Sequence, residues 1–236
     1  MERADRGVEM FPLKDENPTQ SKPILTWILI AVNLGIFFGT WFSGKLEEVV
    51  LAYGMKPNEV LAGRELHTLF TSMFLHGGIL HVLGNVWYLW IFGDNIEDVL
   101  GKARFIGFYF ATGLVASLAH ALANAGSSIP TIGASGAIAG VLGAYLVLYP
   151  WARVHTAIFI FYFIQLVTIP AIVLIGFWFV LQMISASVTW VAGITSGVAY
   201  LAHIGGFLAG MLLILPLALR KRKEPEYTYS INWGWE

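Results

Sequence analysis

Apolar stretches long enough to cross a lipid bilayer recur along the whole chain. A spanning helix needs about 20 predominantly apolar residues, and the segment 24–42 meets this requirement without a charged side chain. Hydrophobic residues make up 57% of the chain and charged residues only 12%, which leaves more apolar surface than a soluble core could cover. The sequence therefore predicts an all-α membrane protein with six transmembrane helices, at about 24–42, 78–93, 105–125, 135–149, 171–187 and 195–219.

The residues between these stretches set the predicted boundaries. The acidic cluster at 94–98 is expected to end the second helix, and Pro170 divides an apolar run that is too long for one span. We expect residues 155–169 to form a membrane-lying connector, and the short fourth helix to end below the membrane surface. No internal repeat is evident, so the simplest organisation is one six-helix domain at 23–219 between an N-terminal segment, 1–22, and a C-terminal tail, 220–236.

Basic residues predict the orientation in the membrane. Cytoplasmic loops carry the excess of Lys and Arg in multi-pass proteins. If the N-terminus is cytoplasmic, only Lys45, Lys56 and Arg64 of the 14 Lys and Arg residues lie outside. Both termini are therefore expected in the cytoplasm, with the loop 44–77 outside. The N-terminal residues show no cleaved signal peptide, and the plasma membrane is the expected location.

Four polar side chains are predicted to lie at a similar depth in the outer half of the membrane. His81 and Asn85 are four residues apart and share one face of the second helix. Ser135 begins the fourth helix, and His203 lies about two turns below the start of the sixth. Small-residue stripes on the fourth and sixth helices would let the two backbones approach closely enough for a Ser–His hydrogen bond. These stripes are formed by Gly136, Gly140, Gly143, Ala199, Gly206 and Gly210.

Each of these residues also has a simpler explanation. A serine between glycines in a membrane most often packs helices and bonds to its own backbone. One intramembrane histidine can equally be a structural residue that bonds a neighbouring carbonyl. The joint occurrence of two histidines, a serine and an asparagine at one depth favours a functional site. His120 and His155 lack such company and are expected to be structural or interfacial.

Serine and histidine together are the residue types of nucleophilic hydrolysis. A serine hydroxyl becomes a good nucleophile when a base accepts its proton, and histidine does so near neutral pH. No carboxylate lies within the spans near His203, so we expect a dyad whose ring is oriented by packing or by a backbone group. Free N–H groups at the start of the fourth helix, including the backbone N–H of Ser135, would face a developing oxyanion. Because hydrolysis needs water, the site should lie in a wet cavity open to the outer face.

Three motifs together resemble the rhomboid intramembrane serine proteases: HGGILHVLGN at 76–85, GASG at 133–136 and AHIGG at 202–206. The resemblance covers about residues 24–219. It implies a six-helix rhomboid-like bundle in the lipid bilayer that cleaves membrane-anchored protein substrates. It also implies that Ser135 is the nucleophile and His203 the general base. The remaining implied positions are Asn85 and His81 at the oxyanion, His76 in a structural role, and Gly133, Gly136 and Gly206 as structural residues near the site.

Two positions depart from the family pattern. His67-Thr68 stand in the first outer loop where many members have Trp-Arg, which raises the question of how that loop is braced. Ala139 stands one turn after the serine, where some members have an aromatic residue that packs on the catalytic imidazole.

Two other classes of protein remain as alternatives. One is a catalytically inactive rhomboid-like protein that binds membrane clients. The other is a small multi-pass transporter, which would usually carry charged groups within its spans. We expect no cofactor, no metal and no nucleic-acid partner, since the chain has no cysteine and no concentrated basic face.

Overall fold

The computed structural model describes residues 9–160, 163–192 and 198–221. The segments 1–8 and 222–236 of the two predicted tails, and the predicted start of the sixth helix at 195–197, lie outside the described residues. All six predicted helices are present, although their ends differ. They are α1 (Ile24–Phe42), α5 (Ile79–Leu100), α6 (Lys102–Ala123), α7 (Ser135–Leu148), α8 (Ala171–Ala192) and α9 (Tyr200–Lys221).

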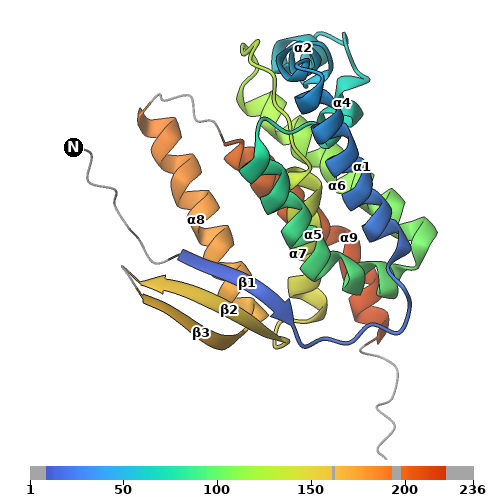
Figure 1. Ribbon diagram of the computed structural model, residues 1–236, viewed down its shortest axis with the longest axis vertical. Coiled ribbons are helices and arrows are strands. Elements are labelled where there is room, and N and C mark those ends of the chain that lie inside the picture. The colour runs from blue at the N-terminus through green and yellow to red at the C-terminus, as the bar shows by residue number, and fades with distance from the viewer. Residues whose placement is uncertain (1–8, 161–162, 193–197, 222–236) are drawn as a thin grey trace, which may run out of the picture.

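The long helices form a bundle with different structures at its two ends (Figure 1). At one end lie the short helices α2 (Leu46–Tyr53), α3 (Pro57–Leu61) and α4 (Thr68–Thr71), followed by the 3-10 turn η1 (Ser72–Phe74). At the other end lies a three-stranded sheet, which α8 meets at the edge of the bundle.

Most of the long helices can cross a membrane by length and composition. Within the described residues, α1, α6, α8 and α9 meet the requirement, and α4–η1 with α5 meets it as a pair bent by 94°. α7 is apolar but has only 14 residues. The chain is therefore a multi-pass membrane protein, and the prediction that α7 also spans the membrane stays a prediction.

The acidic cluster does not end the second predicted helix, because α5 continues through it to Leu100. Glu97 is 2% exposed and accepts hydrogen bonds from the backbone N–H groups of Leu25 (3.0 Å) and Thr26 (2.8 Å). Asp98 accepts bonds from the N–H groups of Gln20 (3.0 Å) and Ser21 (2.9 Å). The first N–H groups of a helix have no intrahelical acceptor. Glu97 supplies these acceptors at the start of α1, and Asp98 does the same for residues 20 and 21 just before it. This explains why the two carboxylates occur within α5.

The sheet is an addition to the predicted all-α fold. It consists of β1 (Glu9–Asp15), β2 (Arg153–Ile160) and β3 (Phe163–Pro170), paired antiparallel in the order β1-β2-β3. The expected connector at 155–169 is thus a hairpin with an apolar outer strand, on which Phe163, Ile164 and Leu166 are exposed.

The N-terminal segment is joined to the helical domain through β1. Asp15 accepts hydrogen bonds from the Tyr145 hydroxyl (2.7 Å) in α7 and from the Asn95 amide (3.1 Å) in α5. Burial raises the pKa of the Asp15 carboxyl above its ordinary value, against the opposing effect of the bond from Tyr145. Residues 9–15 therefore belong to the folded unit.

Helices α7 and α9 pack backbone against backbone. Every residue of α7 from Gly136 to Tyr145 is buried. A Cβ atom on Gly206 would collide with the carbonyl oxygen of Gly136, and one on Gly210 with that of Gly140. The close approach predicted from the small-residue stripes is confirmed, and it places the start of α7 beside the second turn of α9.

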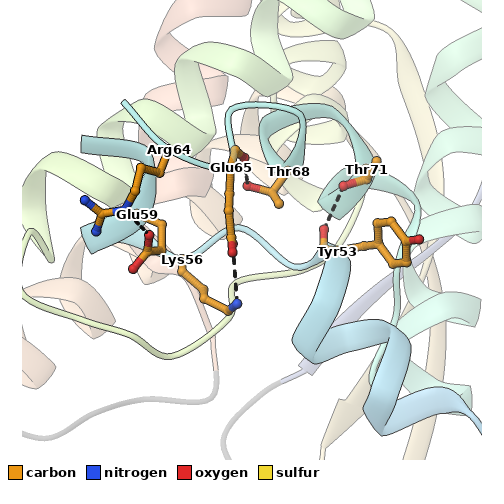
Figure 2. A network of polar contacts seen from close by, with 7 residues as sticks. All are labelled: Tyr53, Lys56, Glu59, Arg64, Glu65, Thr68 and Thr71. Carbon is orange, nitrogen blue, oxygen red and sulfur yellow. Dashed lines mark hydrogen bonds and ion pairs between the residues drawn. The ribbon is translucent and has the colours of Figure 1, made fainter. Parts of the chain in front are cut away.

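The predicted outer loop, residues 44–77, is braced by polar contacts spread along its length (Figure 2). Arg64 pairs with Glu59 (2.6 Å) and Lys56 with Glu65 (3.4 Å), and the Thr68 hydroxyl donates to the carbonyl of Glu65 (2.7 Å). The Thr71 hydroxyl donates to the carbonyl of Tyr53 (2.7 Å). Surface ion pairs contribute little individually. The loop is therefore braced by several of these contacts together. They occur in a loop where many family members have a Trp-Arg pair.

Candidate active site

Ser135 and His203 meet where α7 begins beside α9. Ser135 is the first residue of α7, and its Oγ lies 2.8 Å from Nε2 of His203. Both side chains are partly buried. This distance is within the range of a nucleophile–base hydrogen bond. The two residues that the sequence predicted to meet, 68 positions apart, are therefore in contact.

The other side of the His203 ring is held by α8. Nδ1 of His203 lies 2.8 Å from Oε1 of Gln182. The Trp178 ring, one turn earlier on α8, lies 5.9 Å from the imidazole centroid at an interplanar angle of 35°. Ala139, where some family members have an aromatic residue, is buried and small. The aromatic contact to the imidazole comes from α8 instead.

Gly133 allows His81 to approach Ser135. Its φ of +126° lies in a region that side chains disfavour. A Cβ atom there would be 2.8 Å from His81 Nε2 and 3.5 Å from Ser135 Oγ. The N–H of Gly133 donates to the carbonyl of Ser72 (2.9 Å), so the outer loop supports the residues just before the serine. Glycine is needed here both for its backbone conformation and for space.

Asn85 and His76 lie behind His81. Asn85 is 7% exposed, and its side-chain amide donates to the carbonyl of His81 at 2.9 Å. His76 is 1% exposed and packs edge-on against His81, with ring centroids 5.0 Å apart. Neither ring nitrogen of His76 has a hydrogen-bond partner among the described residues. His76 therefore contacts the site through the ring of His81.

A cavity of about 750 Å³ contains Ser135, His203 and His81 but not Asn85. Its walls come from α5, α6, α8, α9 and the loop 127–132 before α7. Thr131 in that loop exchanges two backbone hydrogen bonds with Met55 of the outer loop (3.0 and 2.8 Å). The cavity thus lies beneath the end of the bundle that carries α2–α4.

His120 and Asn124 also line this cavity, although the sequence interpretation placed His120 elsewhere. They repeat the spacing of His81 and Asn85, and in both pairs the asparagine amide donates to the histidine carbonyl four residues earlier at 2.9 Å. This repeated His-x-x-x-Asn spacing was the signal that could have placed α6 at the site. Within the described residues, no group of three or more His, Asp or Glu side chains could hold a metal.

Comparisons with known proteins show the family of this chain. The family model described as the Rhomboid domain matches residues 63–220. The chain is 32% identical over 202 residues to "Rhomboid protease GluP" of Bacillus subtilis, a match that covers 85% of this chain and 36% of that protein.

Two eukaryotic relatives extend the comparison. "Rhomboid protein 1, mitochondrial" of Saccharomyces cerevisiae is 27% identical over 222 residues, which cover 89% of this chain and 58% of that protein. "RHOMBOID-like protein 1" of Arabidopsis thaliana is 34% identical over 173 residues, which cover 72% of this chain and 38% of that protein. The chain thus spans between about a third and three fifths of the length of these relatives. The family model, the relatives and the apolar helices together show that this chain is a multi-pass membrane protein of the rhomboid family.

Proposed function

We propose that this protein is a serine endopeptidase that hydrolyses peptide bonds in or near the transmembrane segments of membrane-anchored proteins. The observation that carries the proposal is the 2.8 Å contact between Ser135 Oγ and His203 Nε2 in a cavity within an apolar bundle. Relatives named rhomboid proteases support the same class of reaction.

The geometry suits acyl transfer. His203 Nε2 accepts the proton of Ser135 Oγ while that oxygen attacks the scissile carbonyl, and the imidazolium then gives the proton to the leaving amine. The backbone N–H of Ser135, at the start of α7, would face the oxyanion together with a His81 ring nitrogen. Water entering the cavity would hydrolyse the acyl-enzyme, with His203 again acting as the base.

The two alternative functions are less consistent with the site. A protein that only binds membrane clients has no need of a serine hydroxyl bonded to an imidazole. A transporter usually has ionisable groups along its pathway. Of the described residues that line the cavity, none is Asp, Glu, Lys or Arg.

Orientation and membrane are also proposals. The fold places β1 and the β2–β3 hairpin at one end of the bundle and the loop 44–77 at the other, as the predicted cytoplasmic termini require. Access of an external protease to a C-terminal tag in intact cells would contradict this orientation. Three relatives are named as mitochondrial, so the plasma membrane stays a prediction that rests on the sequence alone.

A fluorophosphonate probe should label the purified protein at Ser135. Such probes phosphonylate a serine whose hydroxyl is activated by a base. Labelling should be lost in Ser135→Ala and His203→Ala, measured by in-gel fluorescence and by mass spectrometry of the modified peptide. Ser127 also lines the cavity, so Ser127→Ala is the matched control and should label normally. An unlabelled wild-type protein, or labelling that survives Ser135→Ala, would reject the proposed function.

Replacing His81 or Asn85 by alanine should lower kcat far more than it changes KM. Donors to the oxyanion act most strongly when charge develops, and losing one typically costs about 10²–10³-fold in kcat. His81 would be such a donor, whereas Asn85 does not line the cavity and would act by holding the His81 turn through its bond to the His81 carbonyl. Asn124→Ala removes the equivalent bond in α6 and should leave kcat close to that of the wild type. An effect confined to KM would assign His81 and Asn85 to substrate binding.

A further inference from the structure

α8 makes two contacts with His203. Neither belongs to the Ser–His pair or to the proposed oxyanion donors. Gln182 faces Nδ1 and Trp178 faces the ring, and one helical turn separates these two residues. Thr189 and Ala186 continue the same face of α8 into the cavity. One face of α8 therefore forms a wall of the cavity and supports the imidazole.

The atom that faces Nδ1 decides which tautomer the imidazole adopts. Oε1 of Gln182 can only accept a hydrogen bond, so its 2.8 Å contact with Nδ1 of His203 is a hydrogen bond when Nδ1 carries the proton. In a neutral imidazole only one nitrogen carries a proton, so Nε2 then has a free lone pair directed at Ser135 Oγ. With the amide reversed, its NH₂ group would face Nδ1, Nε2 would be protonated, and His203 could not accept the serine proton.

We propose that Gln182 is a positioning residue that holds His203 in the tautomer able to deprotonate Ser135. The inference rests on the proposed function and extends it to α8. When the proton moves from Ser135 to Nε2, the Nδ1–H···Oε1 bond remains in place, so the imidazolium keeps its orientation and gains a polar partner. A neutral amide does this without placing a carboxylate among apolar helices, where an ion is costly.

The contact between Gln182 and His203 depends on α8, a helix that buries few of its residues. The buried residues of α8 are confined to its first two turns, at Ala171, Leu174 and Ile175. An apolar cavity of about 510 Å³ begins at two of these residues, Leu174 and Ile175, and separates the following turns of α8 from β1, β2, α5 and α7. Gln182 lies past the buried turns, so the bond to His203 is one of the contacts that hold this part of α8 to α9.

Gln182→Ala and Gln182→Met test the role of the side-chain acceptor. Met keeps a similar volume and cannot accept the Nδ1 proton as an amide does. In metal sites, losing a group that orients a histidine typically costs about 10–100-fold, and we expect kcat to fall by a similar factor with KM changed by no more than about twofold. Met183→Ala is the matched control, because Met183 is the next residue, is 49% exposed and has no role in the site. It should cleave like the wild type.

Gln182→Glu separates positioning from packing. A carboxylate would accept the same proton, so this variant should be more active than Gln182→Ala above neutral pH. It would also stabilise the imidazolium, so the acidic limb of the kcat/KM profile should move to higher pH, by about one unit. The other titratable side chains that line the cavity among the described residues are His81 of α5, His120 of α6 and Tyr200 of α9, and all are unchanged in these variants. An unshifted limb in Gln182→Glu would contradict the inference.

Nitrogen-15 NMR of histidine-labelled protein tests the tautomer without an activity assay. The wild type should show His203 protonated at Nδ1 and unprotonated at Nε2, and Gln182→Ala should show a mixture of tautomers. Wild-type protein that neither labels with fluorophosphonate nor cleaves a substrate would reject the proposed function, while the NMR result would still decide the role of Gln182. An Nε2-protonated ring in the wild type, or unchanged kcat and tautomer in folded Gln182→Ala and Gln182→Met, would overturn the inference.

Discussion

Replacing Ser135 or His203 by alanine should reduce cleavage of a membrane-anchored reporter substrate to the background rate. In the proposed mechanism no neighbouring side chain can replace either residue, because Oγ of Ser135 is the attacking atom and Nε2 of His203, 2.8 Å away, takes its proton. In soluble serine proteases the loss of either group costs about 10⁶-fold in kcat. We therefore expect a loss of at least about 10⁴-fold for each variant in reconstituted vesicles.

The double variant distinguishes a catalytic unit from two independent residues. Because the hydroxyl has no function without its base, Ser135→Ala with His203→Ala should be scarcely slower than either single variant. Thermal unfolding of the three proteins should remain close to that of the wild type, since both side chains are only partly buried. Substantial cleavage by a purified single variant, or losses that multiply in the double variant, would exclude a Ser–His dyad.

The helices could be predicted because the requirements of the bilayer are strict. Uninterrupted apolar stretches such as 24–42 must form helices there, since a helix satisfies its own backbone. The strand pairing of 153–170 could not be predicted in the same way. A short apolar run without alternation can be either a helix or a strand, and the partner of this hairpin, β1, lies more than 130 residues away. The acidic cluster was interpreted as a helix end because its partner, the start of α1, is also distant in sequence.

The part of the candidate site that could be predicted consists of polar residues that are rare within membrane-spanning helices. Ser135 and His203 were identified from their depth and from the glycines beside them, and the structure brings them together. Gln182 was missed because, with no carboxylate near His203 in the spans, the ring was expected to be oriented by packing or by a backbone group, and the structure places a side-chain amide at Nδ1 instead. A single glutamine on an apolar helix carries no periodic signal, and its role depends on how α8 packs against α9. The same reasoning applies to Trp178, which replaces an aromatic contact that Ala139 cannot make.

We expect the contact between α7 and α9 to set the distance between Ser135 and His203. Gly206 lies three residues after His203, almost one turn, and its Cα packs directly on the carbonyl oxygen of Gly136, the residue after Ser135. Ser135, His203 and this backbone contact are therefore nearly at the same level. Any change in the separation of these backbones moves Ser135 relative to His203.

Gly206→Ala should consequently impair catalysis although it adds only one methyl group. Alanine favours a helix over glycine by about 1 kcal/mol, so any loss must come from packing. The new Cβ would meet a backbone oxygen, which no rotamer change can move. We expect about 1–3 kcal/mol of destabilisation from overpacking and roughly a 10²-fold loss of cleavage, because a shift of about 1 Å in catalytic groups has an effect of this size.

Two other glycines provide the comparison for this result. A Cβ on Gly107 meets nothing within 4 Å, so Gly107→Ala should leave cleavage and thermal stability unchanged or slightly improved. A Cβ on Gly205 would be 2.6 Å from the Cβ of Ala119, a side-chain atom, so Ala119→Gly should restore much of the activity lost in Gly205→Ala. No side-chain substitution can rescue Gly206→Ala in this way, because its obstacle is the backbone of α7. Wild-type cleavage by folded Gly206→Ala would show that the backbone contact does not set the Ser135–His203 distance, and the small residues around the serine would then serve only to pack the helices.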